Sequence, residues 1–518
     1  MSGMPKPLTL RAACRAALGV ATLSCALSAF AAEPRRDDTS ITIYSSAAPG
    51  AIPPELYRPT PGVGMPRGMA IPGYAMVRHD RPLTLTAGTS TVRFTDVAAY
   101  IDPTTVQFGS LTDAANTRVL EQNFQFDLVG TDKLLSKYID REVTLERATG
   151  DRVTTLTGTL LSAMDGLVLR SRDGQIHAVR DYSSIRFGEL PGGLITRPTL
   201  VWDVQAQRAG EHRTRVSYQT GGITWWADYN LVFGEGANAN SGFLDVGAWV
   251  SIINQSGASY PDAKLKLIAG DVQRIQPEAP QFQLRAKEAM AASMDAAGFQ
   301  QKDFFEFHLY TLGRRTTLPD NSTKQIELFE AAKRVPARKI LVYFGAPVQY
   351  FHPEPLIDRN FGVQMNKKVD VYLEFRNEEK VSLGIPLPAG RMRVAQLDKA
   401  DGSLEFIGED VIDHTPKNED VRVRLGSAFD VVGERRQVDF RVDSSAKWVE
   451  EEIEVRLRNH KKEPVEVVVK ENLYRWTNWQ ILRSTHKHEK EDARTIHIPV
   501  RVEKDGETVV RYRVRYTW

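Results

Sequence analysis

Residues 453–459, Ile-Glu-Val-Arg-Leu-Arg-Asn, alternate apolar and charged side chains and end on asparagine. Residues 371–377, Val-Tyr-Leu-Glu-Phe-Arg-Asn, have the same form, and residues 249–254, Trp-Val-Ser-Ile-Ile-Asn, resemble them. A period of two places apolar side chains on one face of a β-strand and polar side chains on the other. Asparagine suits the turn that follows, because its short side chain bonds local backbone and tolerates left-handed geometry. The three stretches predict successive immunoglobulin-like β-sandwich modules.

The spacing of these strands indicates the size of each module. The final asparagines are 377 − 254 = 123 and 459 − 377 = 82 positions apart, which suits modules of about a hundred residues, the first enlarged by an insertion. Residues 276–302 form this insertion, and their Ala- and Met-rich stretch has high helix propensity. We expect a short helical linker there, with its helix between residues 283 and 298.

Residues 139–190 predict a different unit, made of five short strands. Asp165-Gly166 and Asp173-Gly174 are hairpin signals, and Gly158 lets the long strand 153–161 bend. Five such strands are typical of a small SH3-like or Sm-like barrel. Barrels of this kind often bind RNA, but the balanced charge of the chain favours a structural or protein-contact role.

The N-terminal part alternates in the same way, and its Pro/Gly-rich residues 49–73 are expected to form a surface loop. The fold class is therefore all-β and multidomain. The expected organisation is a leader at 1–31, an N-terminal β domain with the Pro/Gly loop at 32–132, the small barrel at 133–192, a β-sandwich with the helical insertion at 193–360, a β-sandwich at 361–440 and a C-terminal β-sandwich at 441–518.

The first 31 residues have the three parts of a secretory signal peptide. Three basic residues precede an apolar run at 16–30, which ends in Ala29-Phe30-Ala31. The run is too short to span a bilayer, so we expect export to the periplasm or cell envelope with cleavage after Ala31. No later apolar stretch reaches 18 residues, so no transmembrane helix is predicted.

Charge and cysteine content narrow the function classes further. Lys6, Arg11 and Arg15 are the only charged residues of the leader, so the exported chain has 64 basic against 65 acidic residues. This balance argues against a nucleic-acid partner, since non-specific affinity for phosphate backbones comes from clustered basic residues. Cys14 and Cys25 both lie in the leader, so the exported chain can hold no disulfide, thiolate metal site or cysteine nucleophile.

Several segments carry a family resemblance. They are ITWWADY at 223–229, NQSG at 254–257, AKLKLIAGD at 263–271, FEFHLY at 305–310, LGIPLPAG at 383–390, GSAFD at 426–430 and YRVRY at 512–516. With these segments the chain resembles a large family of exported bacterial proteins of unknown function, some of which carry the name mucoidy inhibitor. The resemblance implies a mostly β protein connected to capsule or envelope homeostasis, with no catalytic residues to carry over. The chain lacks the long coiled-coil insert of the mucoidy-inhibitor members.

Four residues are the candidates for catalysis. Glu306 and His308 lie two apart on an expected strand, so both project from one face and could form an acid–base pair. Asp228 follows Trp225 and Trp226, and Asp271 could join it in a second site. An exposed ion pair is the structural alternative for the first pair, and no phosphate loop or nucleophile elbow accompanies either pair.

His486 and His488 are weak candidates for metal binding, with Glu489 and Glu491 beside them. An alternating strand would place the two imidazoles about 7 Å apart, and no third ligand is spaced to close a site. We therefore expect a solvated loop or strand end, and no cofactor.

The last residues admit two interpretations. Val510, Tyr512, Val514, Tyr516 and Trp518 alternate with arginines, as in the final strand of an outer-membrane barrel. The preceding runs are short and densely charged on both phases, so we favour a final sandwich strand.

The sequence as a whole favours a non-enzymatic binding or scaffold protein in envelope homeostasis, with a protein or glycan partner. A hydrolase acting on envelope polymers through carboxylate and histidine acid–base chemistry is the alternative, and an outer-membrane-associated β protein is a second one.

Overall fold

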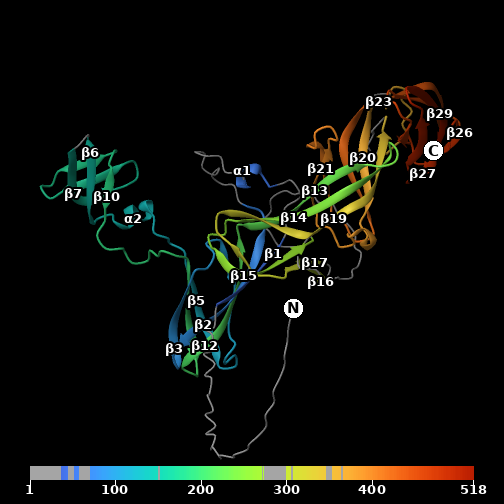
Figure 1. The fold of residues 1–518 in the computed structure, drawn as a ribbon. Helices are drawn as coiled ribbons and strands as arrows, with labels where there is room; N and C mark the ends of the chain where they lie inside the picture. The colour runs from blue at the N-terminus through green and yellow to red at the C-terminus, as the bar shows by residue number, and fades with distance from the viewer. Residues whose placement is uncertain are drawn as a thin grey trace, which may run out of the picture. The chain divides into compact units, whose positions relative to one another are not determined.

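The computed structural model describes residues 37–44, 52–57, 71–149, 152–270, 272, 299–304, 307–345, 353–362 and 366–518. Of these residues 65% lie in strands and 3% in helices, which confirms the prediction of an all-β protein. Several sheets make up the chain (Figure 1). The expected helix at 283–298 and the leader lie outside the described residues.

Two sheets combine N-terminal strands with strands from the middle of the chain. The eight-stranded sheet contains β16 (Phe299–Phe304), β17 (Phe307–Leu312), β15 (Tyr260–Ala269), β1 (Asp38–Tyr44), β2 (Tyr74–Leu85), β12 (Gly210–Gly221), β4 (Ile101–Ser110) and β18 (Thr316–Leu318). The three-stranded sheet contains β3 (Gly88–Thr95), β11 (Thr199–Ala206) and β5 (Thr117–Gln125). Trp202 of β11 is fully buried against Phe94 and Phe108, so its large apolar ring joins the two sheets.

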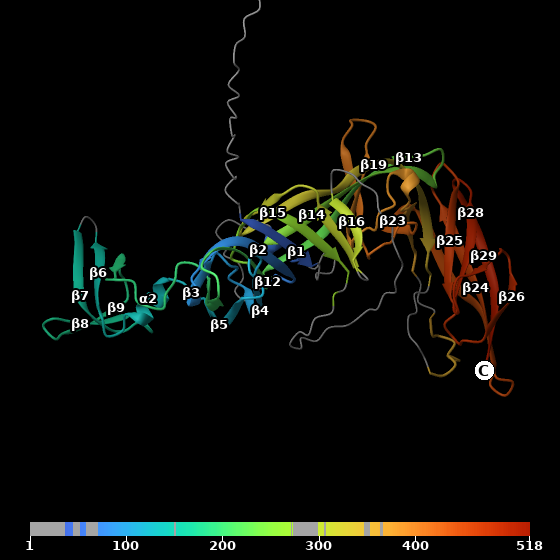
Figure 2. The same ribbon diagram turned by 90° about the horizontal axis from the view of Figure 1, so that it is seen from below.

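A five-stranded sheet lies at the residues where the small barrel is predicted. Its order is β10 (Ser184–Arg186), β6 (Glu142–Thr149), β7 (Arg152–Ser162), β8 (Leu167–Ser171) and β9 (Ile176–Val179). Figure 2 shows this sheet with helix α2 (Thr131–Lys137), which the sequence analysis missed. Leu135 and Tyr138 pack with Leu145, Leu160 and Leu169 in a core of its own. All five expected strands are present, and closure into an SH3-like or Sm-like barrel stays a prediction.

The remaining strands form one thirteen-stranded sheet. Its main path is β22 (Leu404–Ile412), β21 (Gly390–Leu397), β13 (Ile223–Glu235), β14 (Ser241–Asn254), β19 (Ser322–Tyr343), β20 (Lys368–Arg376), β23 (Asp420–Asp443), β24 (Trp448–Asn459), β29 (Gly506–Thr517) and β26 (Trp479–Ser484). Off this path lie β25 (Val465–Asn472), β28 (Thr495–Val502) and β27 (Glu489–Lys490). A single turn of 3₁₀ helix, η1 (Glu379–Val381), follows β20.

Two long strands connect this sheet. Strand β19 pairs with β14 through residues 322–338 and with β20 through residues 337–343. Strand β23 pairs with β20 through residues 420–432 and with β24 through residues 431–443. Each long strand therefore changes its partner along its length, so neighbouring groups of strands are joined by continuous backbone hydrogen bonding rather than by flexible linkers.

All three predicted asparagines are buried, and two of them, Asn254 and Asn459, occupy matching corners. The Asn254 side-chain amide donates to the carbonyl of Ala258 at 2.9 Å, and its oxygen accepts from the Ser256 backbone N–H. Asn459 makes the same two contacts at the same offsets, to Glu463 and from Lys461. Each also bonds a distant carbonyl, at Pro319 and Glu503 respectively. Neither residue has a positive φ, so the corner depends on their hydrogen bonding and not on left-handed backbone.

The Pro/Gly-rich segment differs from the expected surface loop where it is described. Residues 54–57 form a short helix, α1 (Pro54–Tyr57). Ile52, Leu56 and Ile71 are buried in a small core with Trp226 and Ile253. Apolar side chains between the prolines therefore anchor the segment to the body of the protein.

No helix among the described residues is long and apolar enough to cross a membrane.

Candidate functional site

Asp228, the first catalytic candidate, is buried and already bonded by neighbouring groups. Its Oδ2 accepts hydrogen bonds from Trp226 Nε1 at 2.8 Å and from Ser251 Oγ at 2.9 Å. Its Oδ1 lies 3.4 Å from Arg393 Nη1 and 3.7 Å from Arg391 Nη2. The carboxylate is therefore buried with two arginines and two hydrogen-bond donors around it, as part of the fold. This arrangement favours a structural role over proton transfer.

Of the other three catalytic candidates, one lies among the described residues and two do not. Asp271 and Glu306 lie outside the described residues. His308 is on β17 of the eight-stranded sheet, where its Nδ1 lies 2.9 Å from Gln301 Nε2. Asp228 is on β13 of the thirteen-stranded sheet. The two described candidates therefore belong to different sheets and bond to different neighbours.

The two metal candidates lie in the loop between β26 and β27 rather than on a strand. His486 Nδ1 lies 3.0 Å from Thr485 Oγ1, and both histidines are half-buried. Within the part of the chain that the structure describes, no group of three or more His, Cys, Asp or Glu residues could hold a metal ion.

The densest set of charged groups lies elsewhere, on the solvent-facing side of β23, β24, β29 and β26. We call this surface the arginine face and define it by eight arginines: Arg436, Arg441, Arg456, Arg458, Arg483, Arg511, Arg513 and Arg515. Their ion-pair partners are six carboxylates: Glu434, Asp439, Glu450, Glu452, Glu454 and Glu507.

Strand register brings these groups together. In the antiparallel pair of β24 and β29, Glu450, Glu452 and Glu454 stand opposite Arg515, Arg513 and Arg511. Directly opposed residues on one face of an antiparallel pair have their Cβ atoms about 5 Å apart, which suits opposite charges. On the other side of β24, Arg441 and Asp439 stand opposite Glu450 and Glu452. Positive and negative groups therefore alternate in the row through Glu450, whereas Asp439 and Glu452 are like charges that share Arg513.

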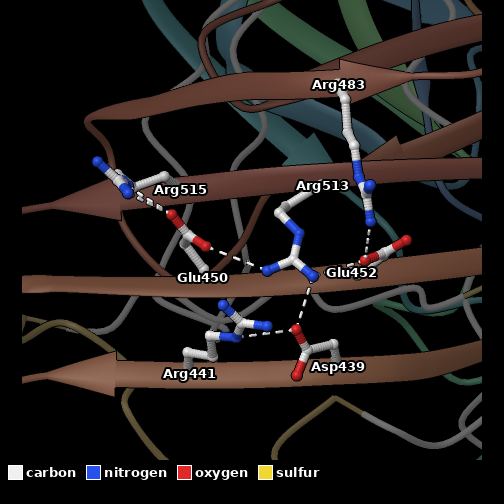
Figure 3. A network of polar contacts seen from close by, with 7 residues as sticks. All are labelled: Asp439, Arg441, Glu450, Glu452, Arg483, Arg513 and Arg515. Atoms are coloured by element: carbon white, nitrogen blue, oxygen red, sulfur yellow. Dashed lines mark hydrogen bonds and ion pairs between the residues drawn. The ribbon is translucent and has the colours of Figure 1, made fainter.

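Arg513 is the centre of this network (Figure 3). Its Nη2 lies 2.6 Å from both Asp439 and Glu452, and its Nη1 lies 3.2 Å from Glu450. These partners come from β23 and β24, while Arg483 of β26 reaches across β29 to Glu452. Hydrogen bonds to Glu452, and then to Asp439 and Glu450, raise the pKa of Arg513 against the effect of burial. The guanidinium thus links three strands as a permanent cation.

Glu454 is the second centre. Burial acts to raise the pKa of this carboxyl, but hydrogen bonds from Arg456, Arg511 and Arg436 outweigh it and lower the pKa to about 2. Three guanidinium groups therefore cover one fully ionised carboxylate at any pH found in a cell.

The charges are separated by depth. The side chains of Glu454, Glu450 and Glu452 are 0%, 7% and 11% exposed, whereas those of Arg483, Arg511 and Arg515 are 63%, 54% and 43% exposed. These three carboxylates therefore lie beneath these three guanidinium groups. The other carboxylates of the face, Glu434, Asp439 and Glu507, are about as exposed as Arg456 and Arg458, and Arg513 is mostly buried. A molecule that approaches Arg483, Arg511 and Arg515 meets cations first, although the whole chain is nearly neutral.

The opposite side of β24 faces the core and carries a second polar arrangement. Glu451, which is buried, pairs with Arg475 at 2.8 Å and accepts a hydrogen bond from Tyr516. Glu471 pairs with the buried Arg435 at 3.0 Å, also with a tyrosine donor, Tyr512. Each buried charge is thus paired and hydrogen-bonded, which a low-dielectric interior requires.

The sequence predicts the strand at 510–518 but not the arginine face. Its signal was present as two period-two patterns, Glu450-Glu452-Glu454 and Arg511-Arg513-Arg515. Each pattern alone is typical of a solvated strand face. Comparison with known proteins adds no assignment, because no family model, curated protein or solved structure matches the chain.

Proposed function

We propose that this protein is exported and acts in the cell envelope as a non-enzymatic binding or scaffold protein, with the arginine face as its docking surface. The observation that carries the proposal is the set of exposed guanidinium groups, those of Arg483, Arg511 and Arg515, that covers the buried carboxylates of Glu450, Glu452 and Glu454. Its side chains are held by ion pairs across four strands, so little side-chain entropy is left to lose when a partner binds.

Two further features support a binding role over hydrolysis. Asp228 is engaged by two arginines, Trp226 and Ser251. The continuous strands β19 and β23 join neighbouring groups of strands into one extended sheet, a rigid support for a docking surface. Export is supported by the leader sequence at 1–31 and by the resemblance to an exported family.

Export is tested first. N-terminal sequencing of periplasmic material should find Ala32 as the first residue. A product that stays in the cytoplasm with Met1 intact would contradict the envelope role.

Complementation of cells that lack the protein then separates binding from catalysis. Arg511→Gln with Arg515→Gln should abolish rescue of the envelope phenotype, because these changes remove two exposed cations. Glu306→Gln and His308→Gln should each retain it. If either of the last two variants folds but fails to rescue, the hydrolase alternative replaces this proposal.

A further inference from the structure

We propose that the arginine face binds an extended acidic segment of a partner protein, one with carboxylates at alternate residues. This inference rests on the proposed function, because it names the partner class of the same surface.

The first argument is spacing. Arg511, Arg513 and Arg515 follow one another at every second residue of β29, so their side chains leave the sheet about 7 Å apart. Arg513 is mostly buried, but Arg483 stands opposite it on β26 and is exposed, so Arg511, Arg483 and Arg515 present guanidinium groups in succession. An extended polypeptide has the same two-residue repeat, so carboxylates at its alternate positions meet these groups in turn. The pairing of Glu450, Glu452 and Glu454 with the same three arginines shows this match within the protein itself.

The second argument is hydrogen-bonding capacity. Arg511 and Arg515 each engage their own glutamate through Nε and Nη2. A guanidinium carries five N–H donors in a planar fork, so the Nη1 group of each remains suited to a second carboxylate. Both side chains are about half exposed. The protein carboxylates orient the guanidinium groups, and the partner adds a second shell of negative charge.

The third argument is charge complementarity combined with selectivity. The face contains eight guanidinium groups and six carboxylates, so its net positive charge is small. A densely charged phosphate backbone gains most from clusters of unpaired cations. A segment with one carboxylate at every second residue carries fewer charges per length and matches the rows of arginines instead.

The test uses the full mature chain and fluorescent peptides of 12 residues. One peptide alternates Glu and Ser, a second has the same composition in two blocks, and a third alternates Lys and Ser. At low salt the alternating acidic peptide should bind about fivefold more tightly than the block peptide, and binding should weaken as salt increases. The alternating Lys peptide should not bind.

Variants locate the site. Arg511→Gln with Arg515→Gln should weaken binding of the alternating peptide by about fivefold or more, as expected for the loss of two ion pairs. The matched control is Arg172→Gln with Arg197→Gln, which removes two exposed arginines outside this face. It should bind like the unmodified chain. If the test variant does not fold, the comparison of alternating and block peptides on the unmodified chain still decides.

Three results would overturn the inference. They are equal affinity for the alternating and block peptides, no binding of either, and preferential binding of polygalacturonate or single-stranded DNA added as competitors. The last would assign the face to a glycan or a nucleic acid. Failure of these binding tests together with loss of rescue by the Arg511→Gln and Arg515→Gln variant would reject the peptide partner but keep the proposed docking function.

Discussion

Single buried polar residues determine local geometry in this protein. The side chain of Asn459 satisfies the carbonyls of Glu463 and Glu503 and the N–H of Lys461. It therefore ties the end of β24 to the turn that precedes β29, forty-four residues later. A buried backbone group that loses such a partner is removed from water without a compensating hydrogen bond, and this destabilises the folded state.

Asn459→Ala should destabilise the strands around this corner by about 2–4 kcal/mol, because several buried backbone groups lose their partners. Hydrogen exchange of amides in β24 and β29 should become faster by roughly 30-fold or more. The control is Asn116→Ala, since Asn116 is exposed and bonds only the Asp113 side chain there. Similar exchange rates in the two variants would contradict this role.

His79 gives the protein a specific sensitivity to acid. It is buried between Thr39 and Tyr218, with its ring nitrogens 3.0 and 3.1 Å from their hydroxyls. Burial, with a smaller contribution from Arg81, lowers the pKa of His79 from 6.5 to about 3. The unfolded chain therefore binds a proton below pH 6.5 that the folded chain does not bind.

The free energy of unfolding should accordingly fall with pH below 6.5, by at most about 2 kcal/mol between pH 6.5 and pH 5 for this one group. His79→Gln should remove that part of the pH dependence. Urea unfolding gives the free energy of unfolding of both proteins at pH 7 and pH 5. The change between the two pH values is then compared between the proteins, so that the contributions of the other titrating groups cancel. An unchanged pH dependence in the variant would exclude His79 as the cause.

At the scale of elements, Arg475 holds a segment against the C-terminal strands. The guanidinium group is fully buried and pairs with Glu451. It also donates to the backbone carbonyls of Leu356, Asp358 and Phe361. One side chain therefore supports both an ion pair in the core and the conformation of residues 353–362.

Arg475→Met should destabilise the protein by about 3–5 kcal/mol, because Glu451 would be left as an unpaired buried charge. Adding Glu451→Met should recover much of this loss, since the unpaired buried charge is then removed. Thermal unfolding of the single and double variants measures both effects.

Residues 353–362 should become sensitive to brief proteolysis in both variants, because their carbonyls lose the same donor. Arg501→Met is the control, since Arg501 is exposed and pairs only with Glu503 at the surface. A double variant that is no more stable than Arg475→Met would argue against the unpaired charge as the cause.

At the scale of the whole molecule, the protein is a set of sheets whose cores are largely separate. The five-stranded sheet with α2 has its own apolar cluster, and an isolated bridge between Leu128 and Ile195 pairs the two chain segments that flank it. The other strands contribute to two larger clusters. The five-stranded sheet with α2 therefore meets the condition for folding alone, because its core is formed by its own residues.

A fragment of residues 127–196 should fold by itself into a β-rich domain, because its core residues all lie within it. Circular dichroism should show strand structure, and urea should unfold the fragment in one cooperative transition. A fragment that lacks a cooperative transition would show that this sheet depends on the rest of the chain.

Much of this architecture could be predicted from the sequence, because strand formation has a local signal. Alternation with a period of two predicted β24 and β29, and the structure buries the apolar residues of that alternation in β29, namely Val510, Tyr512, Val514 and Tyr516. Asp-Gly and glycine positions predicted all five strands of the small sheet. The helix α2 was missed because its seven residues are too few to show a helical period.

Which strands meet, and in which register, was decided by the tertiary structure alone. Glu450 and Arg515 are 65 residues apart, and Glu451 and Arg475 are 24 apart. No local pattern shows that the neighbouring residues Glu450 and Glu451 lie on opposite sides of the sheet and pair with different arginines. Strand pairing is a non-local contact whose energy depends on packing of the complete sheets. The strands and their buried faces therefore follow from the sequence, whereas the arginine face exists only once distant strands have paired.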